Sequence, residues 1–346
     1  MKNRNKTILI TGGGGYIGSE LSKYLLKKKY NIIILDRFYF NNNPSFIKNK
    51  NVKIVKGDNR NIDNNIFKKV STVIDLVSLG IAPSGSNAYD KYTNEINFES
   101  RFKNAKKSKK FGVKRYIFPS SCSVYGFQNS KICNEASKLN PQSSYAKSKI
   151  KCEKNILPLG DKNFTVTALR LPTVFGVSER MRFDIIVNAM TFDALENKKI
   201  KLLRNGKQRR PFVHIKDVCR AFHFFINKDV NLINNQIINI GDESNNINLI
   251  DLVSLIFKTL KIKKKIEWYG AKDDRSYFVS YSKMRQLGFK CLYNLDYGIN
   301  EIHKNYNLGL LRKSTDTISL KWFDELMKWN EIIEKIKLNN YILKNK

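Results

Sequence analysis

Hydrophobic residues occur along the chain in short runs that alternate with stretches of helical period. The runs at residues 7–12 (TILITG) and 31–36 (NIIILD) are typical of buried strands, and the segment between them places Ile17, Leu21 and Leu25 on one face of a helix. This succession predicts a strand–helix–strand unit. The same rhythm predicts further strands at 52–58, 71–79, 114–121 and 164–171, with helices between them, the longest near residues 89–111.

Strands of this uniformly apolar kind, separated by helices, predict a parallel sheet that is covered on both faces. With right-handed crossovers this is an α/β fold with a doubly wound sheet of Rossmann type. The rhythm changes after residue 175, where residues 180–199 have a helical pattern, whereas residues 237–242 return to a strand. We expect a Rossmann-type domain over 1–175, an interleaved, smaller C-terminal substrate lobe over 176–312, and a helical tail over 313–346 with a packing or subunit-contact role.

Length and composition allow a globular enzyme. The chain has 346 residues, of which 42% are hydrophobic, and no run approaches the length of about eighteen apolar residues that a membrane span needs. Since the N-terminal residues run directly into the first strand pattern, we expect a soluble, uncleaved, cytoplasmic protein without membrane insertion. The five cysteines are widely spaced without a CxxC and the three histidines are scattered, which predicts neither a disulfide framework nor a metal site.

The formal net charge of +33 is large enough to attract an anionic partner. Because the lysines are dispersed along the whole chain together with many asparagines and isoleucines, we interpret the charge as compositional. The functional alternative is that the positive electrostatic field of the protein attracts a doubly charged substrate. A non-catalytic RNA-binding protein is the rival hypothesis from another class, although we expect no nucleic-acid partner.

Glycines follow the first strand pattern in TGGGGYIGSE. Gly12, Gly15 and Gly18 stand three apart and open a helix, an arrangement that permits a tight turn and lets backbone N–H groups approach a pyrophosphate. The second strand ends at Asp36, whose carboxylate can accept hydrogen bonds from an adenosine ribose. The pattern predicts NAD rather than NADP, because Asp36 would repel a 2′-phosphate, although Arg37 could soften that preference.

Two further patterns bear on a dinucleotide. Asp58 follows the third strand, where its carboxylate either meets the adenine amino group or closes an Asx turn, and both alternatives stay open. Tyr145 and Lys149 stand four apart on one predicted helical face. Most such pairs are surface residues, but this one follows the glycine pattern and SSCSVYG, which favours a tyrosine base whose pKa is lowered by nearby positive charge.

The order TGGGGYIG, GDNRN, SSCSVYG, YAKSK and RPFVHIKDV closely resembles the extended short-chain dehydrogenase/reductase family, the NAD-dependent nucleotide-sugar epimerase and dehydratase group, from residue 7 to about residue 300. The resemblance implies that Ser121 and Tyr145 bind the reacting sugar oxygen and that Lys149 holds the cofactor. Asn97 matches a position that helps to order the active-site helix. The implied cofactor site consists of Gly12, Gly15, Tyr16, Ile17, Gly18, Asp36, Arg37, Asp58, Asn59, Leu76, Asn97, Tyr145 and Lys149.

The resemblance also implies a nucleotide-diphosphate sugar as substrate and a homodimer as the assembly. Arg210 and Arg275 match positions that clamp the diphosphate, where a planar guanidinium can donate two hydrogen bonds. Asp217 is expected to fix the loop that presents Arg210, and His214 is expected to be a packed histidine rather than a general base. The implied substrate-binding residues are Ser121, Ser123, Asn188, Arg210 and Arg275.

Residues 122 and 123 depart from the dehydratases that the chain resembles. Dehydratases carry an acid pair or a single Glu after the catalytic hydroxyl, whereas this chain has Cys122 and Ser123. Since neither is suited to eliminating water, a dehydratase is disfavoured, and without a paired histidine Cys122 is not expected to be a nucleophile. The expected function is oxidation at C4 of the sugar through a 4-keto intermediate by a 4-epimerase, with a C4 dehydrogenase or 4-ketoreductase as the alternative.

Overall fold

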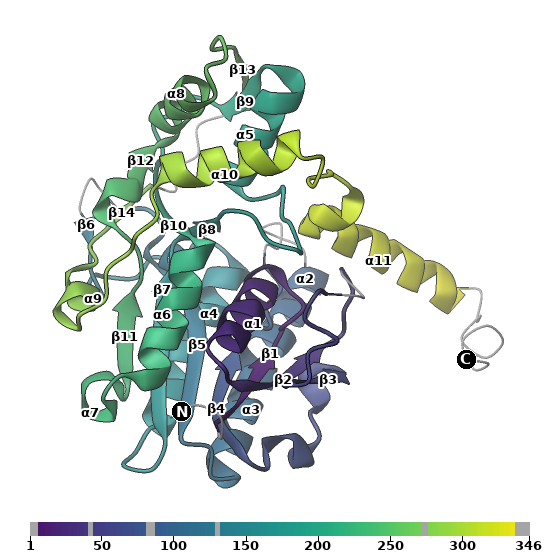
Figure 1. The fold of residues 1–346 in the computed structure, drawn as a ribbon, viewed down its shortest axis with the longest axis vertical. Helices are drawn as coiled ribbons and strands as arrows, with labels where there is room; N and C mark the ends of the chain where they lie inside the picture. The colour runs from purple at the N-terminus through teal and green to yellow at the C-terminus, as the bar shows by residue number, and fades with distance from the viewer. Residues whose placement is uncertain (1–5, 41–43, 81–86, 129–131, 271–275, 336–346) are drawn as a thin grey trace.

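The computed structural model describes residues 6–40, 44–80, 87–128, 132–270 and 276–335. Within these residues the main feature is a sheet of seven strands in the order β11-β7-β5-β4-β1-β2-β3, all of them parallel (Figure 1). The chain reverses its direction of winding between β1 and β4, and ligands bind at such a point in doubly wound sheets. The strands are β1 (Thr7–Thr11), β2 (Asn31–Asp36), β3 (Val52–Lys56), β4 (Val70–Asp75), β5 (Arg115–Ser121), β7 (Thr165–Leu171) and β11 (Gln236–Asn239).

Helices cover both faces of this sheet, which confirms the predicted doubly wound α/β architecture. On one face α1 (Tyr16–Lys27) and α6 (Ile215–Asn227) pack side by side, and Leu21 and Leu25 of α1 are fully buried, as their period predicts. On the other face lie α3 (Ser100–Lys110) and α4 (Ser144–Ile156), which share a hydrophobic cluster with the sheet.

A second lobe lies at the carboxyl ends of the strands, in the upper part of Figure 1. It is built around α5 (Ile186–Asn197), α8 (Leu249–Leu260) and α10 (Leu295–Asn307), whose apolar residues form a separate hydrophobic cluster. The strand predicted at 237–242 is β11, which returns to the large sheet beside β7. The remaining elements are α2 (Asn87–Asn94), β6 (Ile132–Cys133), β8 (Thr173–Phe175), β9 (Ile200–Leu203), β10 (Arg209–His214), α7 (Val230–Ile233), β12 (Asn246–Asn248), β13 (Ile266–Tyr269), β14 (Phe278–Val279), α9 (Ser282–Gln286) and α11 (Ser319–Lys335).

Three predicted elements differ from the structure near the carboxyl ends of the strands. The strand expected at 71–79 ends at Asp75, because the carbonyls of Asp75 and Val77 accept hydrogen bonds from a buried arginine instead of a neighbouring strand. The helix expected at 180–199 begins only at Ile186. The long helix near 89–111 is interrupted by a π-helical turn, Glu95–Glu99. Among the described residues, no helix is long and apolar enough to cross a membrane.

Candidate functional site

The glycine turn between β1 and α1 depends on glycine for steric reasons. Gly12 has φ +73°, and a Cβ at Gly18 would lie only 2.1 Å from the Gly12 carbonyl oxygen. Opposite the turn, the Asp36 carboxylate accepts hydrogen bonds from the backbone N–H groups of Gly14 (2.9 Å) and Phe38 (2.7 Å). Burial raises the pKa of Asp36, and these backbone donors oppose that rise. The turn and the carboxylate thus form one edge of a cleft.

The cleft opens into a cavity of about 770 Å³ that reaches from the glycine turn to the second lobe. The lining of this cavity suits NAD. The exposed backbone at the N-terminus of a helix suits the pyrophosphate, the acidic residue at the end of β2 suits the ribose, and the buried lysine suits the nicotinamide riboside. Most of the predicted cofactor residues line this cavity, namely Gly12, Gly15, Tyr16, Ile17, Gly18, Asp36, Arg37, Asp58, Asn59, Leu76, Tyr145 and Lys149.

Asp58 and Arg37 are paired with each other at the wall of the cavity. The Arg37 guanidinium lies 2.9 Å from Asp58, and Arg60 lies 2.7 Å from the same carboxylate, which lowers the pKa of Asp58. Asp58 also caps the short turn that follows it by accepting from the Arg60 N–H. The Asx-turn interpretation is therefore confirmed, and a contact with adenine stays a prediction. Asn59 anchors the wall by donating to Ser100 at 3.0 Å.

The three predicted catalytic residues converge at the carboxyl end of β5. Ser121 ends the strand, and Tyr145 lies in the first turn of α4 within hydrogen-bonding reach of its hydroxyl. Lys149 follows one helical turn later, with its Nζ 5.0 Å from the centre of the Tyr145 ring. The ammonium donates to the Ser78 hydroxyl and to the Pro119 carbonyl, both at 3.3 Å. The fold thus places a hydroxyl, a phenol and a cation together in one cavity.

Burial dominates the electrostatics of this group. The side chain of Lys149 is 1% exposed, and burial, followed by repulsion from Arg101, lowers its pKa to about 7. Burial also raises the pKa of Tyr145, while the hydrogen bond with Ser121 lowers it by a smaller amount. This direction differs from the expected lowered pKa, because desolvation of the phenol outweighs the positive charges around it.

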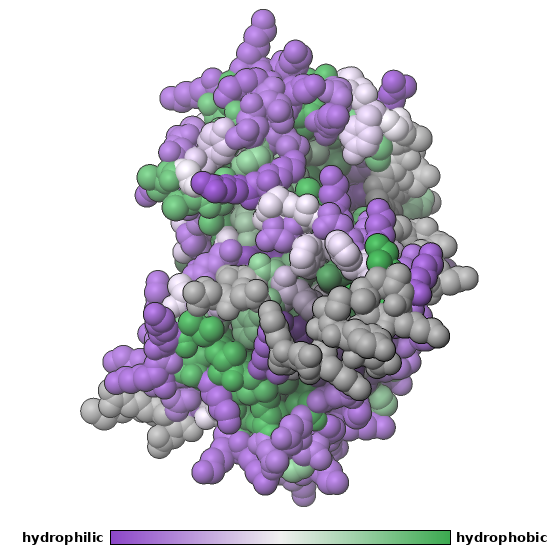
Figure 2. All heavy atoms as spheres, turned by 90° about the vertical axis from the view of Figure 1, so that its right-hand side faces the viewer, coloured by the Kyte–Doolittle hydropathy of each residue, from purple (hydrophilic) through white to green (hydrophobic). Residues whose placement is uncertain are grey.

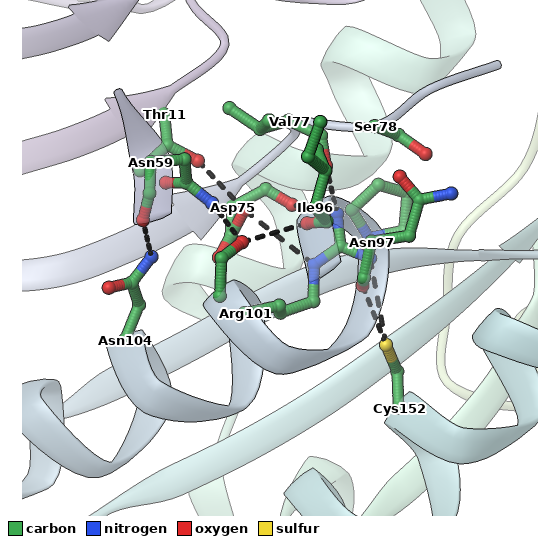
Figure 3. Close-up of polar contacts among 12 residues, drawn as sticks. Thr11, Asn59, Asp75, Val77, Ser78, Ile96, Asn97, Arg101, Asn104 and Cys152 are labelled. Carbon is green, nitrogen blue, oxygen red and sulfur yellow. Dashed lines mark hydrogen bonds and ion pairs between the residues drawn. The ribbon is translucent and has the colours of Figure 1, made fainter. Parts of the chain in front are cut away.

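A buried polar network under the cavity holds the segment that carries Ser78 (Figure 3). Arg101 of α3 donates to the carbonyl oxygens of Asp75 (3.2 Å) and Val77 (2.7 Å), and its Nε lies 3.6 Å from the Asp75 carboxylate. The Asn97 side chain holds the end of this segment by accepting a hydrogen bond from the Leu79 N–H at 2.7 Å. Asn97 is fully buried and does not line the cavity, so its place in the cofactor site stays a prediction. Sequence reasoning missed Arg101, because residues 76–79 were assigned to a strand.

The comparisons with known proteins agree with this geometry. The sequence profile described as the NAD dependent epimerase/dehydratase family matches residues 8–241, which is more than half of the chain. The chain belongs to this family. It is therefore an enzyme of an NAD-dependent family, and NAD is its cofactor.

Relatives within the family differ in activity. An uncharacterized UDP-glucose epimerase of Bacillus subtilis is 28% identical, with 72% of this chain and 80% of the relative covered. A dTDP-D-glucose 4,6-dehydratase of Dictyostelium discoideum is 27% identical, with coverage of 90% and 85%. The solved UDP-glucuronic acid 4-epimerase of Bacillus cereus, in complex with UDP-glucuronic acid and NAD, shares the fold with a TM-score of 0.78 at 23% identity, covering 87% of this chain and 99% of its own.

The structure of this family member gives Asn188 a different position from the one expected at the substrate diphosphate. Asn188 is fully buried and accepts from the Gly176 N–H at 3.0 Å, while its amide donates to the Tyr16 hydroxyl and the Arg182 carbonyl, both at 3.1 Å. Because all of its polar atoms are bonded behind the cavity wall, Asn188 ties the loop after β8 to α1.

The other predicted substrate residues have separate positions. Arg210 of β10 is 8% exposed and lines the cavity. Ser123 also lines the cavity, and its hydroxyl has no hydrogen-bond partner among the described residues. Arg275 lies outside the described residues. Two arginines that sequence reasoning did not single out, Arg180 and Arg182, line the cavity as well.

Three residues considered for chemistry have structural roles. Cys122 is fully buried, and burial raises the pKa of its thiol well above the usual value, so it is no nucleophile. His214 is confirmed as a packed histidine that lies 3.1 Å from Glu301. Asp217 accepts from the backbone N–H groups of residues 292 and 293. It therefore fixes that loop, and the expectation that it fixes the loop presenting Arg210 is wrong.

Proposed function

We infer that this enzyme is an NAD-dependent 4-epimerase of a nucleotide-diphosphate sugar that acts through a 4-keto intermediate. The observation that carries this proposal is the convergence of Ser121, Tyr145 and Lys149 in the cavity that begins at the glycine turn. A hydroxyl and a phenol on one side of the cavity suit a sugar C4 oxygen, which must lose and regain a proton. NAD, when bound, accepts and returns the hydride at C4.

Tyr145 is the proposed proton-transfer residue. An ordinary tyrosine has a pKa of about 10, and its use as a base at neutral pH requires a shift of about 3 units, or about 4 kcal/mol. Since burial outweighs the neighbouring positive charges and raises the pKa of Tyr145, we propose that the nicotinamide cation of bound NAD, together with Lys149 at 5.0 Å from the phenol ring, supplies the shift that the base requires. Ser121 forms a hydrogen bond with the phenol oxygen. We propose that Lys149 also holds the ribose hydroxyls of the cofactor, since its Nζ already meets the hydroxyl of Ser78 in the cavity wall.

The residues around Ser121 disfavour dehydration. Elimination of water requires an acid and a base beside the sugar, but the next two residues are a buried cysteine and a serine. Among the described residues that line the cavity, the carboxylates are Asp36, Asp58 and Asp184, and arginines bind the last two of them. The likeness to a 4,6-dehydratase thus reflects shared ancestry, and C4 chemistry is the proposed activity.

Arg210 is the proposed diphosphate clamp of the substrate. It lines the cavity from β10, which pairs with β8 and β12 and not with the large sheet, and its guanidinium stays charged at all relevant pH values. Arg275 is proposed for the same role. A homodimer and a cytoplasmic location, both expected from the sequence, complete the proposal, and light scattering of the purified protein would test the dimer.

A panel of sugar nucleotides tests the activity. The purified protein is incubated with UDP-, GDP-, CDP- and dTDP-sugars, with near-ultraviolet absorbance for NADH and nuclear magnetic resonance for the product configuration. An inverted C4 centre without accumulation of NADH supports the epimerase. Stoichiometric NADH identifies the alternative, a C4 dehydrogenase. Tight, salt-dependent RNA binding without any bound nicotinamide cofactor would contradict both.

A further inference from the structure

The C-terminal helix α11 reaches the dinucleotide side of the cavity with its first turns. Ser319 and Phe323 line the cavity together with Phe40, which follows β2. The Phe40 and Phe323 rings meet edge to face, with their centres 5.8 Å apart. The rest of α11 extends away from the body of the molecule (Figure 1). The tail thus contributes to the wall of the cavity as well as to the surface.

Arg180 connects this helix to the cavity. It is 5% exposed, its guanidinium lies 3.9 Å from the centre of the Phe40 ring, and one Nη donates to the Ser319 hydroxyl at 2.8 Å. Its Nε–H is buried without an acceptor among the described residues. Burial and repulsion from Arg182 lower the pKa of Arg180 to about 10, so the group is a cation at neutral pH. A buried cation with an unused donor in a cavity wall is unfavourable unless an anion completes it.

The neighbours of Arg180 indicate which kind of anion its guanidinium faces. The loop that carries it is joined to the start of α1, where the Ser178 hydroxyl donates to the Tyr16 carbonyl at 2.8 Å. The Asp36 carboxylate, which accepts from the Gly14 N–H of the glycine turn, is close enough to the Arg180 guanidinium that this cation lowers the pKa of Asp36. The guanidinium therefore lies near the helix N-terminus that receives the pyrophosphate of a dinucleotide.

We propose that Arg180 binds the diphosphate of NAD from the side opposite the glycine turn, and that α11 is the positioning element that holds Arg180 there. Ser319 fixes one end of the guanidinium, and Phe323 supports the ring of Phe40 on which it stacks. This proposal rests on NAD binding and is independent of the proposed reaction at C4.

Additional contacts keep the start of α11 in place. The Phe183 N–H donates to the Thr317 carbonyl at 2.8 Å, and the Tyr89 hydroxyl donates to Asp324. By contrast, Trp329 is 62% exposed farther along the helix. Figure 2 looks onto this side of the molecule, whose described surface is mostly hydrophilic with hydrophobic residues gathered in its lower half. Because Trp329 lies on α11 but is not among the residues that line the cavity, it provides a matched control.

Titration of the cofactor-free protein with NADH, followed by its fluorescence, tests the proposal. Arg180→Gln is expected to raise the Kd about tenfold or more, because a hydrogen bond to a charged group is lost. Ser319→Ala and Phe323→Ala are expected to raise it by less, and Trp329→Ala to leave it unchanged. Circular dichroism and the melting temperature of each variant report on folding.

Two further ligands distinguish the diphosphate of NAD from other anions. Reduced nicotinamide riboside, which carries neither phosphate of the diphosphate, should bind Arg180→Gln and the wild type equally. UDP, a probe of the sugar-nucleotide side, should also bind both equally in calorimetry. An unchanged NADH affinity of Arg180→Gln, a selective loss of UDP affinity, or a wild type that binds no NADH would each overturn the proposal. Normal NADH results without sugar conversion would contradict only the proposed function.

Discussion

The two sides of the cavity differ in whether their buried arginine is paired with a carboxylate. Around Lys149, Arg101 and Asn97 hold the segment after β4 through hydrogen bonds to its carbonyls and N–H groups. Arg101 is also paired with the buried Asp75 carboxylate, whereas Arg180 is held by a ring, a hydroxyl and a carbonyl, and no carboxylate among the described residues lies within ion-pair distance of it. Because a buried charge is unfavourable unless it is paired, the Arg101 side contributes to folding, whereas we propose that an anionic ligand completes the Arg180 side. Stability and affinity thus depend on different residues.

The largest expected effect is a loss of turnover when Tyr145 is substituted. Tyr145→Phe keeps the ring but removes the hydroxyl that transfers the proton, so the rate of sugar conversion should fall about 10²–10⁴-fold. The NADH affinity and the melting temperature should be unchanged, which separates chemistry from folding. Full activity of this variant would show that the proton-transfer residue is misassigned.

The next effect concerns the folding role of the network. Arg101→Met leaves the Asp75 carboxylate, which accepts from Thr11 at 2.8 Å and from Tyr116, buried without its cation. We expect the free energy of unfolding to fall by about 3–5 kcal/mol, measured by urea denaturation. Lys103→Met, at an exposed position of the same helix, is the control and should be nearly neutral. Equal stability of the two variants would remove the distinction between the two sides.

A smaller effect, counted per pH unit, is expected in the pH dependence of stability. The pKa of Lys149 is about 7 in the folded protein and about 10.4 in an unfolded chain. Between these values the unfolded state binds a proton that the folded state does not, so the contribution of Lys149 to stability rises with pH, by up to about 1.4 kcal/mol per unit.

The difference between wild type and Lys149→Met isolates this contribution. Urea denaturation from neutral to alkaline pH should show a wild type that gains stability relative to the variant as the pH rises. Lys154→Met, exposed on the same helix, should follow the wild type. Parallel curves for wild type and Lys149→Met would mean that Lys149 has an ordinary pKa.

The smallest effect is expected at Cys122. Because its thiol is fully buried and protonated, Cys122→Ala should leave turnover unchanged and cost about 1 kcal/mol of stability. Kinetics and thermal unfolding of the variant check both. A large loss of activity without a loss of stability would restore the thiolate hypothesis.

Local patterns predicted much of the fold and of the cofactor site. The strands β1, β2, β3, β5 and β7 lie where the apolar runs are, since a buried parallel strand requires a continuous apolar stretch. The errors lie at strand ends and loops. Residues 76–79 look like a strand continuation, and only the contacts of Arg101 with their carbonyls end the strand at Asp75.

The sequence by itself determined the glycine turn, the acidic end of β2 and the spacing of Tyr145 and Lys149, because these features depend on neighbours along the chain. Only the tertiary structure decided that Asn188 is a tether, that Arg101 supports the catalytic segment, and that α11 reaches the cavity. The physical reason is that burial and hydrogen-bond partners depend on residues far apart in sequence, as for Arg180 and Ser319. A linear pattern contains the side chains but not their partners.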